Sequence, residues 1–228
     1  MNSLIPLIPF LPFIGFLING LFGKNLSKNA VGIIGSGALL ASFLLSVACF
    51  NQVGATGPIQ STLYNFMSVG NLHVNFGFLV DHLSVWMMLI VTGVGFLIHV
   101  YSIGYMHDDE GLWKFFAYLN LFIFSMLLLI MGDNLLMLFF GWEGVGLCSY
   151  LLIGFWNKNR EYVKAANKAF IMNRIGDLGL LLGIFLIYKT FGSVNFSEIF
   201  AAIPTIQPEA GVLTLICMLL FIGAMGKS

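Results

Sequence analysis

Long apolar stretches, separated by short polar connections, dominate the chain. A stretch of about 20 apolar residues is long enough to cross the hydrocarbon core of a bilayer as a helix. The pattern predicts an all-α polytopic membrane protein, with about seven transmembrane helices in a single membrane domain of residues 1–228. The predicted helices are residues 3–22, 30–50, 82–104, 113–131, 134–155, 168–189 and 211–228.

The first and last apolar stretches lead to different expectations. Pro6, Pro9 and Pro12 stand near the start of the first stretch, where a helix tolerates proline. Lys24 and Lys28 follow this stretch and no basic residue precedes it, which is the opposite of a secretory signal peptide. We therefore expect the first stretch to remain as a helix. The last stretch ends without a following loop or cap, so we expect it to be incomplete and the chain to be the first part of a longer protein.

The connection 51–81 is too long for a simple turn. Residues 72–78 alternate between apolar side chains and polar or small ones, and residues 63–69 precede the turn pair Gly70–Asn71. Two segments with a period of two, joined by such a pair, predict a β-hairpin in this loop. Asp81 is then expected to cap the third helix.

Basic residues gather in alternate connections. Seven of them lie at 23–29, at the border of 105–112 and at 156–168: Lys24, Lys28, Lys114, Lys158, Arg160, Lys164 and Lys168. The other connections, 51–81, 132–133 and 190–210, contain none. Because short cytoplasmic loops carry the excess of Lys and Arg, the N-terminus is predicted to lie outside, and the hairpin with it.

Composition narrows the possible functions. Hydrophobic residues make up 59% of the chain, charged residues 9%, and the formal net charge is zero. No basic field favours nucleic acid, so the expected partners are lipids and other membrane subunits. The 3 cysteines and 4 histidines lack metal-ligand spacing, and we predict no metal or cofactor site in this chain. The acidic run 107–111 favours a solvated loop at a helix start over a cation site.

Glu143 is the most informative single residue. The apolar stretch around it has no other charge between Asp133 and Lys158. In a helix that starts near Asn134, Glu143 lies about 15 Å along the axis, close to the middle of a bilayer. An acidic group there costs about 2.5–3.5 kcal/mol on translocon scales, so it normally faces a partner or water on an ion or proton path. The alternative is a packing carboxylate that is hydrogen-bonded to a neighbouring helix.

Gly141, Gly144 and Gly146 surround this carboxylate. Their lack of side chains lets another helix or a file of waters approach Glu143. The same glycines could instead mark only a close crossing of two helices, a common use of small residues in membranes.

The sixth stretch carries four charged residues on one side of a helix: Lys164, Lys168, Arg174 and Asp177. Lys164 and Lys168 can reach lipid headgroups. Arg174 and Asp177 lie deeper, three residues apart, and can pair with each other. An electrostatic role in function and a structural ion pair are the two interpretations.

Lys227 ends the seventh stretch, about 24 Å along a helix that starts at Gly211. Burial disfavours the protonated form of such a lysine, whereas a nearby carboxylate favours it. These opposing effects predict a lysine whose proton affinity can be switched.

Three segments carry a family resemblance: GDNLLMLFFGWEGVGLCSYLLIGFW, NKAFIMNRIGDLGLLLG and FIGAMGKS, at residues 132–156, 167–183 and 221–228. The chain resembles the large antiporter-like subunit, called chain L or subunit 5, of respiratory complex I, the NADH:quinone oxidoreductase. The resemblance extends over essentially all 228 residues. The first subunit of multisubunit sodium/proton antiporters is a more distant relative, which shares the Ser-Tyr-Leu-Leu-Ile-Gly-Phe-Trp element.

The resemblance implies roles for particular residues. Glu143 and Lys227 match the proton-transfer pair of the family, and Arg174 and Asp177 match its charged positions on the sixth helix. Lys164 and Lys168 would support this charged network. The implied fold is the first part of an antiporter-like arrangement with inverted repeats.

The resemblance also implies a function, which is a proton-translocating subunit in the membrane arm of complex I, in a bacterial inner membrane or an equivalent energy-transducing membrane. Quinone reduction, FMN and the iron–sulfur clusters of electron transport would lie in partner subunits, and a neighbouring partner would be another antiporter-like subunit. Two alternatives stay open: a subunit of a cation/proton antiporter driven by a sodium gradient, and a structural scaffold whose charges only hold helices in register.

Overall fold

The computed structural model of the protein describes residues 4–70, 72–206 and 208–227. The expected helix ends at residues 3 and 228, and Asn71 of the hairpin turn, lie outside the described residues. In chain order the elements are α1 (Leu7–Phe22), η2 (Gly23–Asn25), α2 (Lys28–Thr56), β1 (Ile59–Val69), β2 (Leu72–Val80), α3 (His82–Tyr105), α4 (Leu112–Met131), α5 (Leu135–Ile153), α6 (Arg160–Phe191), α7 (Phe196–Ile206) and α8 (Ala210–Lys227).

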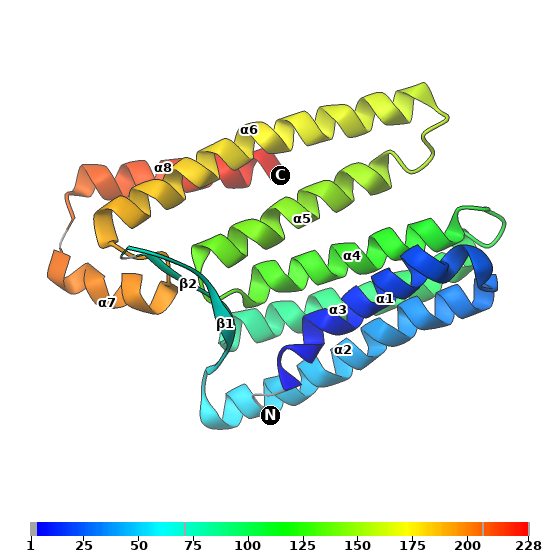
Figure 1. Cartoon of the computed structure of the whole chain (residues 1–228), viewed down its shortest axis with the longest axis horizontal. Helices are drawn as coiled ribbons and strands as arrows, with labels where there is room; N and C mark the ends of the chain where they lie inside the picture. The colour runs from blue at the N-terminus through cyan, green and yellow to red at the C-terminus, as the bar shows by residue number, and fades with distance from the viewer. Residues whose placement is uncertain (1–3, 71, 207, 228) are drawn as a thin grey trace.

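Seven of the described helices are long and apolar enough to cross a membrane: α1 (with η2), α2, α3, α4, α5, α6 and α8. Their axes are roughly aligned, with α1 to α6 alternating in direction along the chain, and a single two-stranded antiparallel sheet lies at one end of the described part (Figure 1). This arrangement confirms the predicted fold class, an all-α polytopic membrane protein with a β-hairpin.

Three segments differ from the expected helix pattern. Helix α2 continues to Thr56, past the expected end at residue 50 and into the connection 51–81. Helix α6 already begins at Arg160, after Asn159, whose side chain accepts a hydrogen bond from the backbone N–H of Glu161 and caps the helix. The connection 190–210, expected to be a loop, contains the short helix α7. Phe196 and Ile199 of this helix pack against the core that α5 and α6 share with the hairpin, and its 11 residues are too few to span a bilayer.

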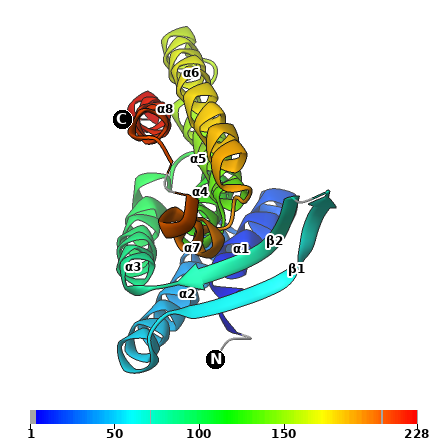
Figure 2. The ribbon, with the colours of Figure 1, turned by 90° about the vertical axis from the view of Figure 1, so that its left-hand side faces the viewer.

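Helices α1 to α4 form one compact group. Helix α1 packs against α2 and α4, and α2 packs against α3. Figure 2 shows this group on one side of α5, with α6 and α8 on the other side. Fully buried Leu39, Met88 and Leu127 belong to the apolar core of the group, which extends to the hairpin. Helix α5 therefore stands between two parts of the fold and packs against both α4 and α6.

The hairpin ties the connections at one end of the bundle together. The Asn134 side chain donates a hydrogen bond to the backbone oxygen of Asn75 in β2 at 2.8 Å. The backbone N–H of Asp133 donates to the backbone oxygen of Gly77 at 3.3 Å. At the end of β2, Asp81 accepts a hydrogen bond from the backbone of the next helix at 2.7 Å, which confirms the predicted cap of α3. The hairpin thus connects the α4–α5 turn to the start of α3.

Helices α6 and α8 approach each other through glycines. A Cβ built on Gly176 would lie 2.7 Å from the Cα of Gly226, and a Cβ built on Gly223 would lie 2.7 Å from the Cβ of Leu180. Small residues allow such contact between backbones in membranes, where van der Waals packing drives helix association. The crossing holds the last turn of α8 beside the middle of α6 (Figure 1).

Leucine at position 176 is expected to separate α6 from α8. A Gly176→Leu variant should lose about 1–3 kcal/mol of stability, because the added atoms overlap the Gly226 backbone. Gly211→Leu is the matched control, since a Cβ on Gly211 meets open space among the described residues. Thermal unfolding of the purified membrane protein measures the difference, and equal unfolding midpoints for the two variants would contradict this packing.

Candidate functional site

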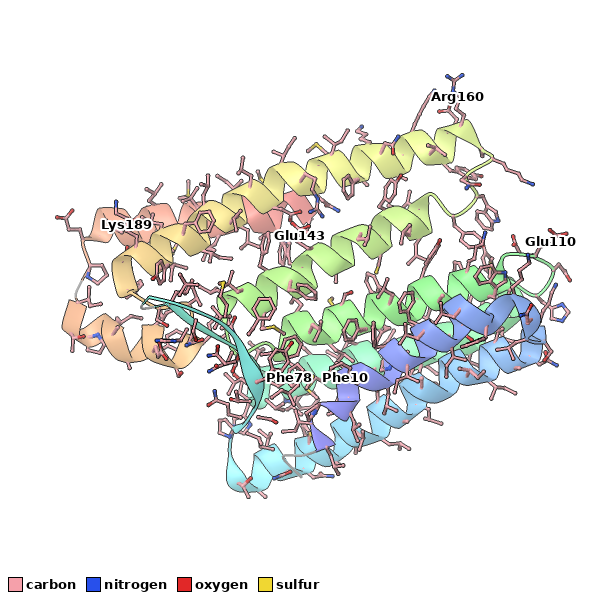
Figure 3. The ribbon with its side chains drawn as sticks, viewed as in Figure 1. Phe10, Phe78, Glu110, Glu143, Arg160 and Lys189 are labelled. Carbon is pink, nitrogen blue, oxygen red and sulfur yellow. The ribbon has the colours of Figure 1, made fainter. Side chains whose placement is uncertain are left out.

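Glu143 lies in the middle of the membrane bundle. Helix α5 begins after Asn134, whose side chain accepts a hydrogen bond from the backbone N–H of Met137 at 2.9 Å and caps the helix. Glu143 follows about 12 Å further along the axis. In Figure 3 it faces the region between α5 and α6, well away from Arg160 and Lys189 at the two ends of α6.

Arg174 of α6 forms an ion pair with Glu143 across the two helices. The same guanidinium reaches Asp177 on its own helix, with 3.3 Å between Nη2 and Oδ2. Arg174 therefore contacts two carboxylates, and its carbon Cζ lies 4.7 Å from the centre of the Phe170 ring. A planar guanidinium with several donors suits this position better than a lysine would.

Asp177 is the most buried of these charged groups. Its side chain is 5% exposed, compared with 28% for Glu143 and 34% for Arg174. The indole N–H of Trp142, in α5, donates a hydrogen bond to Oδ1 of Asp177 at 2.6 Å. One carboxylate oxygen thus contacts the indole and the other faces Arg174, which offsets the cost of burying the charge.

Lys227 reaches the same group from α8. Its Nζ donates a hydrogen bond to the backbone oxygen of Trp142 at 2.9 Å and lies 5.5 Å from the centre of the Trp142 ring. The predicted partner, Glu143, is bound to Arg174 instead, so Lys227 joins this site through Trp142. We call Glu143, Arg174, Asp177 and Lys227 the charged cluster.

The three glycines near Glu143 have different roles. Gly141 and Gly144 allow α4 to pack closely, because a Cβ on either would overlap Leu129 or Ser125. A Cβ on Gly146 would instead lie 2.6 Å from Nζ of Lys227 and 3.1 Å from Nη2 of Arg174. Gly141 and Gly144 thus mark a close helix crossing, whereas Gly146 makes room for the two cations, a role that the sequence did not indicate.

Two of the predicted residues lie outside the cluster. Lys164 pairs with Glu161 one turn before it on the exposed start of α6, at 2.8 Å. Lys168 is also exposed. Their positions agree with an interaction with lipid headgroups and not with a contact to Glu143.

Trp142 is the residue that sequence reasoning missed. It appeared there only as part of a motif, whereas in the structure its indole contacts Asp177 and its carbonyl contacts Lys227. Its position next to Glu143 in an apolar stretch is a sequence feature that could have identified it, because a buried indole N–H usually needs a hydrogen-bond acceptor.

The acidic run 107–111 has a structural role at the opposite end from the hairpin. Asp109 accepts hydrogen bonds from the indole N–H of Trp156 at 2.8 Å and from the backbone N–H of Gly111 at 2.6 Å. These bonds favour the carboxylate and lower the pKa of Asp109. Within the described residues, no group of three His, Cys, Asp or Glu side chains has an arrangement that could hold a metal ion.

The cluster combines two acids and two bases, so it is neutral when all four side chains are charged. Its members come from three helices, and the α6–α8 crossing and the α5–α6 contact hold them together. Any change in protonation leaves a net charge in a medium of low dielectric, where the remaining partners respond strongly. The arrangement can therefore bind or release a proton in a way that depends on its other members.

Comparisons with known proteins agree with this architecture. The family described as "NADH-Ubiquinone oxidoreductase (complex I), chain 5 N-terminus" matches residues 66–116. The family described as "NADH:quinone oxidoreductase/Mrp antiporter, TM" matches residues 132–228, which include the whole charged cluster. These two matches define the class of the chain as an antiporter-like membrane subunit.

Relatives narrow this class. NADH-quinone oxidoreductase subunit L of Campylobacter jejuni is 48% identical over 231 residues, which cover 100% of this chain and 37% of that protein. Subunit L of Pseudomonas aeruginosa is 45% identical, over 99% of this chain and 38% of its own length. Within the antiporter-like subunits, the chain belongs to the family of NADH-quinone oxidoreductase subunit L. It spans about a third of the length of these relatives.

Solved structures share the fold. The Mrp complex from Dietzia contains a chain with a TM-score of 0.84 and 22% identity, covering 98% of this chain and 24% of that one. A chain of the membrane-bound sulfane sulfur reductase, an archaeal respiratory membrane complex, has a TM-score of 0.81 and 21% identity, covering 98% of this chain and 44% of that one. The helix arrangement is thus shared with chains of these two membrane complexes.

Proposed function

We propose that this chain translocates protons as part of the membrane arm of an NADH:quinone oxidoreductase, and that the charged cluster is its proton-transfer site. The observation that carries the proposal is the meeting of Glu143, Arg174, Asp177 and Lys227 where the last turn of α8 lies beside the middle of α5 and α6. Ionisable groups at this depth are costly and normally serve an ion or proton path.

Arg174 connects the two carboxylates of the proposed mechanism. While Glu143 is ionised, it holds the guanidinium between itself and Asp177. When Glu143 takes up a proton, its attraction for Arg174 is lost and the guanidinium interacts more strongly with Asp177. The negative field of Asp177 is then more fully neutralised.

Lys227 responds to this change through Trp142. Its ammonium group lies beside the residue that contacts Asp177, so neutralising Asp177 removes an attraction that keeps the lysine protonated. A proton arriving at Glu143 thereby favours release of a proton from Lys227. Lys227 acts as the proton store, and Arg174 and Trp142 transmit the electrostatic change between the two sites.

The redox chemistry that drives this cycle belongs to other subunits. FMN, iron–sulfur clusters and quinone would be bound there, and a neighbouring antiporter-like subunit would be the closest partner in the membrane. The names of the relatives and the multisubunit setting of the fold neighbours support this assignment.

A cation/proton antiporter is the second candidate, because the family matching residues 132–228 includes the Mrp antiporters. In that case a sodium gradient, and not NADH oxidation, would drive proton movement. Sodium-dependent proton flux without NADH in vesicles would favour the antiporter and overturn the first assignment.

We propose that the N-terminus lies outside the membrane-enclosed compartment. Arg160 and Glu110 lie at the end of the bundle away from the hairpin (Figure 3). At this same end, Lys28 donates a hydrogen bond to the backbone oxygen of His107 at 2.7 Å, joining two connections rich in charge. This end would face the cytoplasm, following the excess of basic residues in its loops.

The substitutions Glu110→Cys and Thr205→Cys test this orientation. Each is made singly in a variant that lacks the three native cysteines. Both positions are exposed, and they lie in connections at opposite ends of the bundle. A maleimide that cannot cross membranes is expected to label the cysteine at 205 in intact cells, and the cysteine at 110 only after permeabilisation. The reverse pattern would show that the orientation is inverted.

Replacing Glu143 by Gln is expected to slow proton transfer through this chain by about 100-fold or more, because the amide cannot take up or release the proton. Proton translocation per NADH oxidised, measured with the intact complex in vesicles, should fall. Glu161→Gln is the matched control, since Glu161 is an exposed acid on α6 outside the cluster. Impaired assembly with unchanged proton flux in the Glu143→Gln complex would support a scaffold role instead.

Trp142→Phe tests the link between Asp177 and Lys227. Phenylalanine retains an aromatic ring and the backbone oxygen, but it removes the indole donor to Asp177. A hydrogen bond to a charged group contributes about 1.5–3 kcal/mol, so we expect the translocation rate to fall about tenfold. Trp156→Phe loses a similar indole–carboxylate bond, to Asp109, outside the cluster. The same loss in both variants would rule out a specific role for Trp142.

A further inference from the structure

The α1–α4 group buries a second set of polar side chains, separate from the charged cluster. Each helix supplies one of them: Asn19, Ser36, His99 and Asn120, which are 0%, 6%, 1% and 0% exposed. Each has one side-chain atom that lacks a hydrogen-bond partner, namely Oδ1 of Asn19, Oγ of Ser36, Nε2 of His99 and Oδ1 of Asn120. Oε1 of Gln52, near the hairpin end of α2, is a fifth such atom in these helices. Native proteins rarely leave buried polar atoms unpaired, so this group of helices needs an explanation.

The register of α2 and α3 is set by two glycine contacts. A Cβ built on Gly32 in α2 would lie 2.8 Å from the Ile103 side chain in α3. A Cβ built on Gly95 in α3 would lie 3.1 Å from the Leu39 side chain in α2. The two helices are therefore antiparallel and in close contact over this length.

This register brings Ser36 opposite His99. Ser36 is one turn from both α2 contacts, and His99 is one turn from both α3 contacts, on the same faces of the two helices. The orphan atoms of the two side chains, a hydroxyl and a ring nitrogen, thus belong to the same region of the α2–α3 interface.

The two asparagines meet beside the same region. A Cβ built on Gly35 would lie 2.9 Å from Nδ2 of Asn120 and 3.3 Å from Nδ2 of Asn19. The His99 ring lies 5.7 Å from the ring of Phe116, which is one turn before Asn120 on α4. Oδ1 of Asn120 faces α1, since a Cβ built on Gly15 would lie 2.7 Å from it. Side chains from all four helices therefore come together at one level of the group.

The two amides and the imidazole each make one hydrogen bond to a backbone carbonyl. The Asn19 amide donates to an α2 carbonyl at 3.3 Å, and the Asn120 amide donates to the carbonyl one turn before it at 2.9 Å. Nδ1 of His99 lies 2.8 Å from the carbonyl oxygen of Gly95, so in the neutral ring Nδ1 carries the hydrogen and Nε2 has a free lone pair. Three of the four orphan atoms are therefore acceptors.

Ser36 has a single O–H and cannot satisfy three acceptors. A water molecule supplies two donors and typically makes about three hydrogen bonds inside a protein. We propose that helices α1 to α4 enclose a bound-water site, in which water molecules donate hydrogen bonds to Asn19, His99 and Asn120 and interact with the Ser36 hydroxyl.

The water site supplies the hydrogen-bond donor that the buried His99 ring lacks. Its Nε2 lone pair accepts a hydrogen bond from the bound water while Nδ1–H donates to Gly95, so both nitrogens of the neutral ring are satisfied. Helix α4 connects this region with the charged cluster, since Ser125, about one and a half turns beyond Asn120, packs against Gly144 next to Glu143. The proposal does not depend on the proposed function, because it rests on neutral groups in other helices.

X-ray footprinting of the intact membrane complex tests the site, because hydroxyl radicals formed from bound water label adjacent side chains. Phe116 and Phe78 are a matched pair, since both are fully buried, and Phe116 contacts His99 while Phe78, in strand β2, belongs to the apolar core. We expect Phe116 to be labelled several-fold faster than Phe78. Equally slow labelling of the two rings would overturn the proposal.

A density map of the native complex at a resolution that reveals waters provides a second test without any substitution. The expected result is at least one water within hydrogen-bond distance of Nε2 of His99 and of an asparagine Oδ1. A dry volume would overturn the proposal. So would a metal cation bound by the asparagine oxygens.

Discussion

The fold depends on one electrostatic constraint, which is that a carboxylate in the middle of a membrane helix needs a cation beside it. Arg174 meets this need by pairing with Glu143 on α5 and Asp177 on α6. The pair can form only if α5 and α6 lie together at this depth, and Lys227 can join only if α8 crosses α6 closely. The glycines of the α6–α8 crossing, and Gly146 on α5, supply the space that these long cations require. Helix packing and electrostatics therefore depend on each other, because each of these glycines lies where a neighbouring helix or a charged side chain needs space.

The two halves of the described bundle bury polar groups in different ways. Helices α5, α6 and α8 hold full charges that neutralise one another, whereas α1 to α4 hold neutral amides, a hydroxyl and an imidazole with free acceptor atoms. Charges are stabilised by direct pairing, while neutral acceptors are well served by water. Helix α5 lies between these environments, and its glycines face α4 on one side and the cations on the other.

The hairpin and the loops act mainly on the ends of the helices. β2 bonds to the turn between α4 and α5 through Asn75 and Gly77, and this turn is where α5 starts. The depth of Glu143 in the membrane is therefore set partly by a structure outside the membrane span. At the other end, Asp109 and Trp156 join the α3–α4 and α5–α6 connections. Helix α5 is thus held at both ends, which suits a helix whose central residue must keep a defined distance from α6.

The sequence alone determined the membrane class, the number of spanning helices, the hairpin and the cap of α3, because apolar length, alternation and capping are local properties. It also singled out Glu143, Arg174, Asp177 and Lys227, since any charge in an apolar run stands out; their role in proton transfer stays a proposal. Only the tertiary structure decided that Arg174 and not Lys227 pairs with Glu143, that Lys164 and Lys168 stay outside the cluster, and that Trp142 belongs to it. These outcomes depend on distances between α5, α6 and α8, and on which side of each helix faces the next. The physical reason is that helix crossings set by small residues, and not spacing along the chain, determine which buried charges meet.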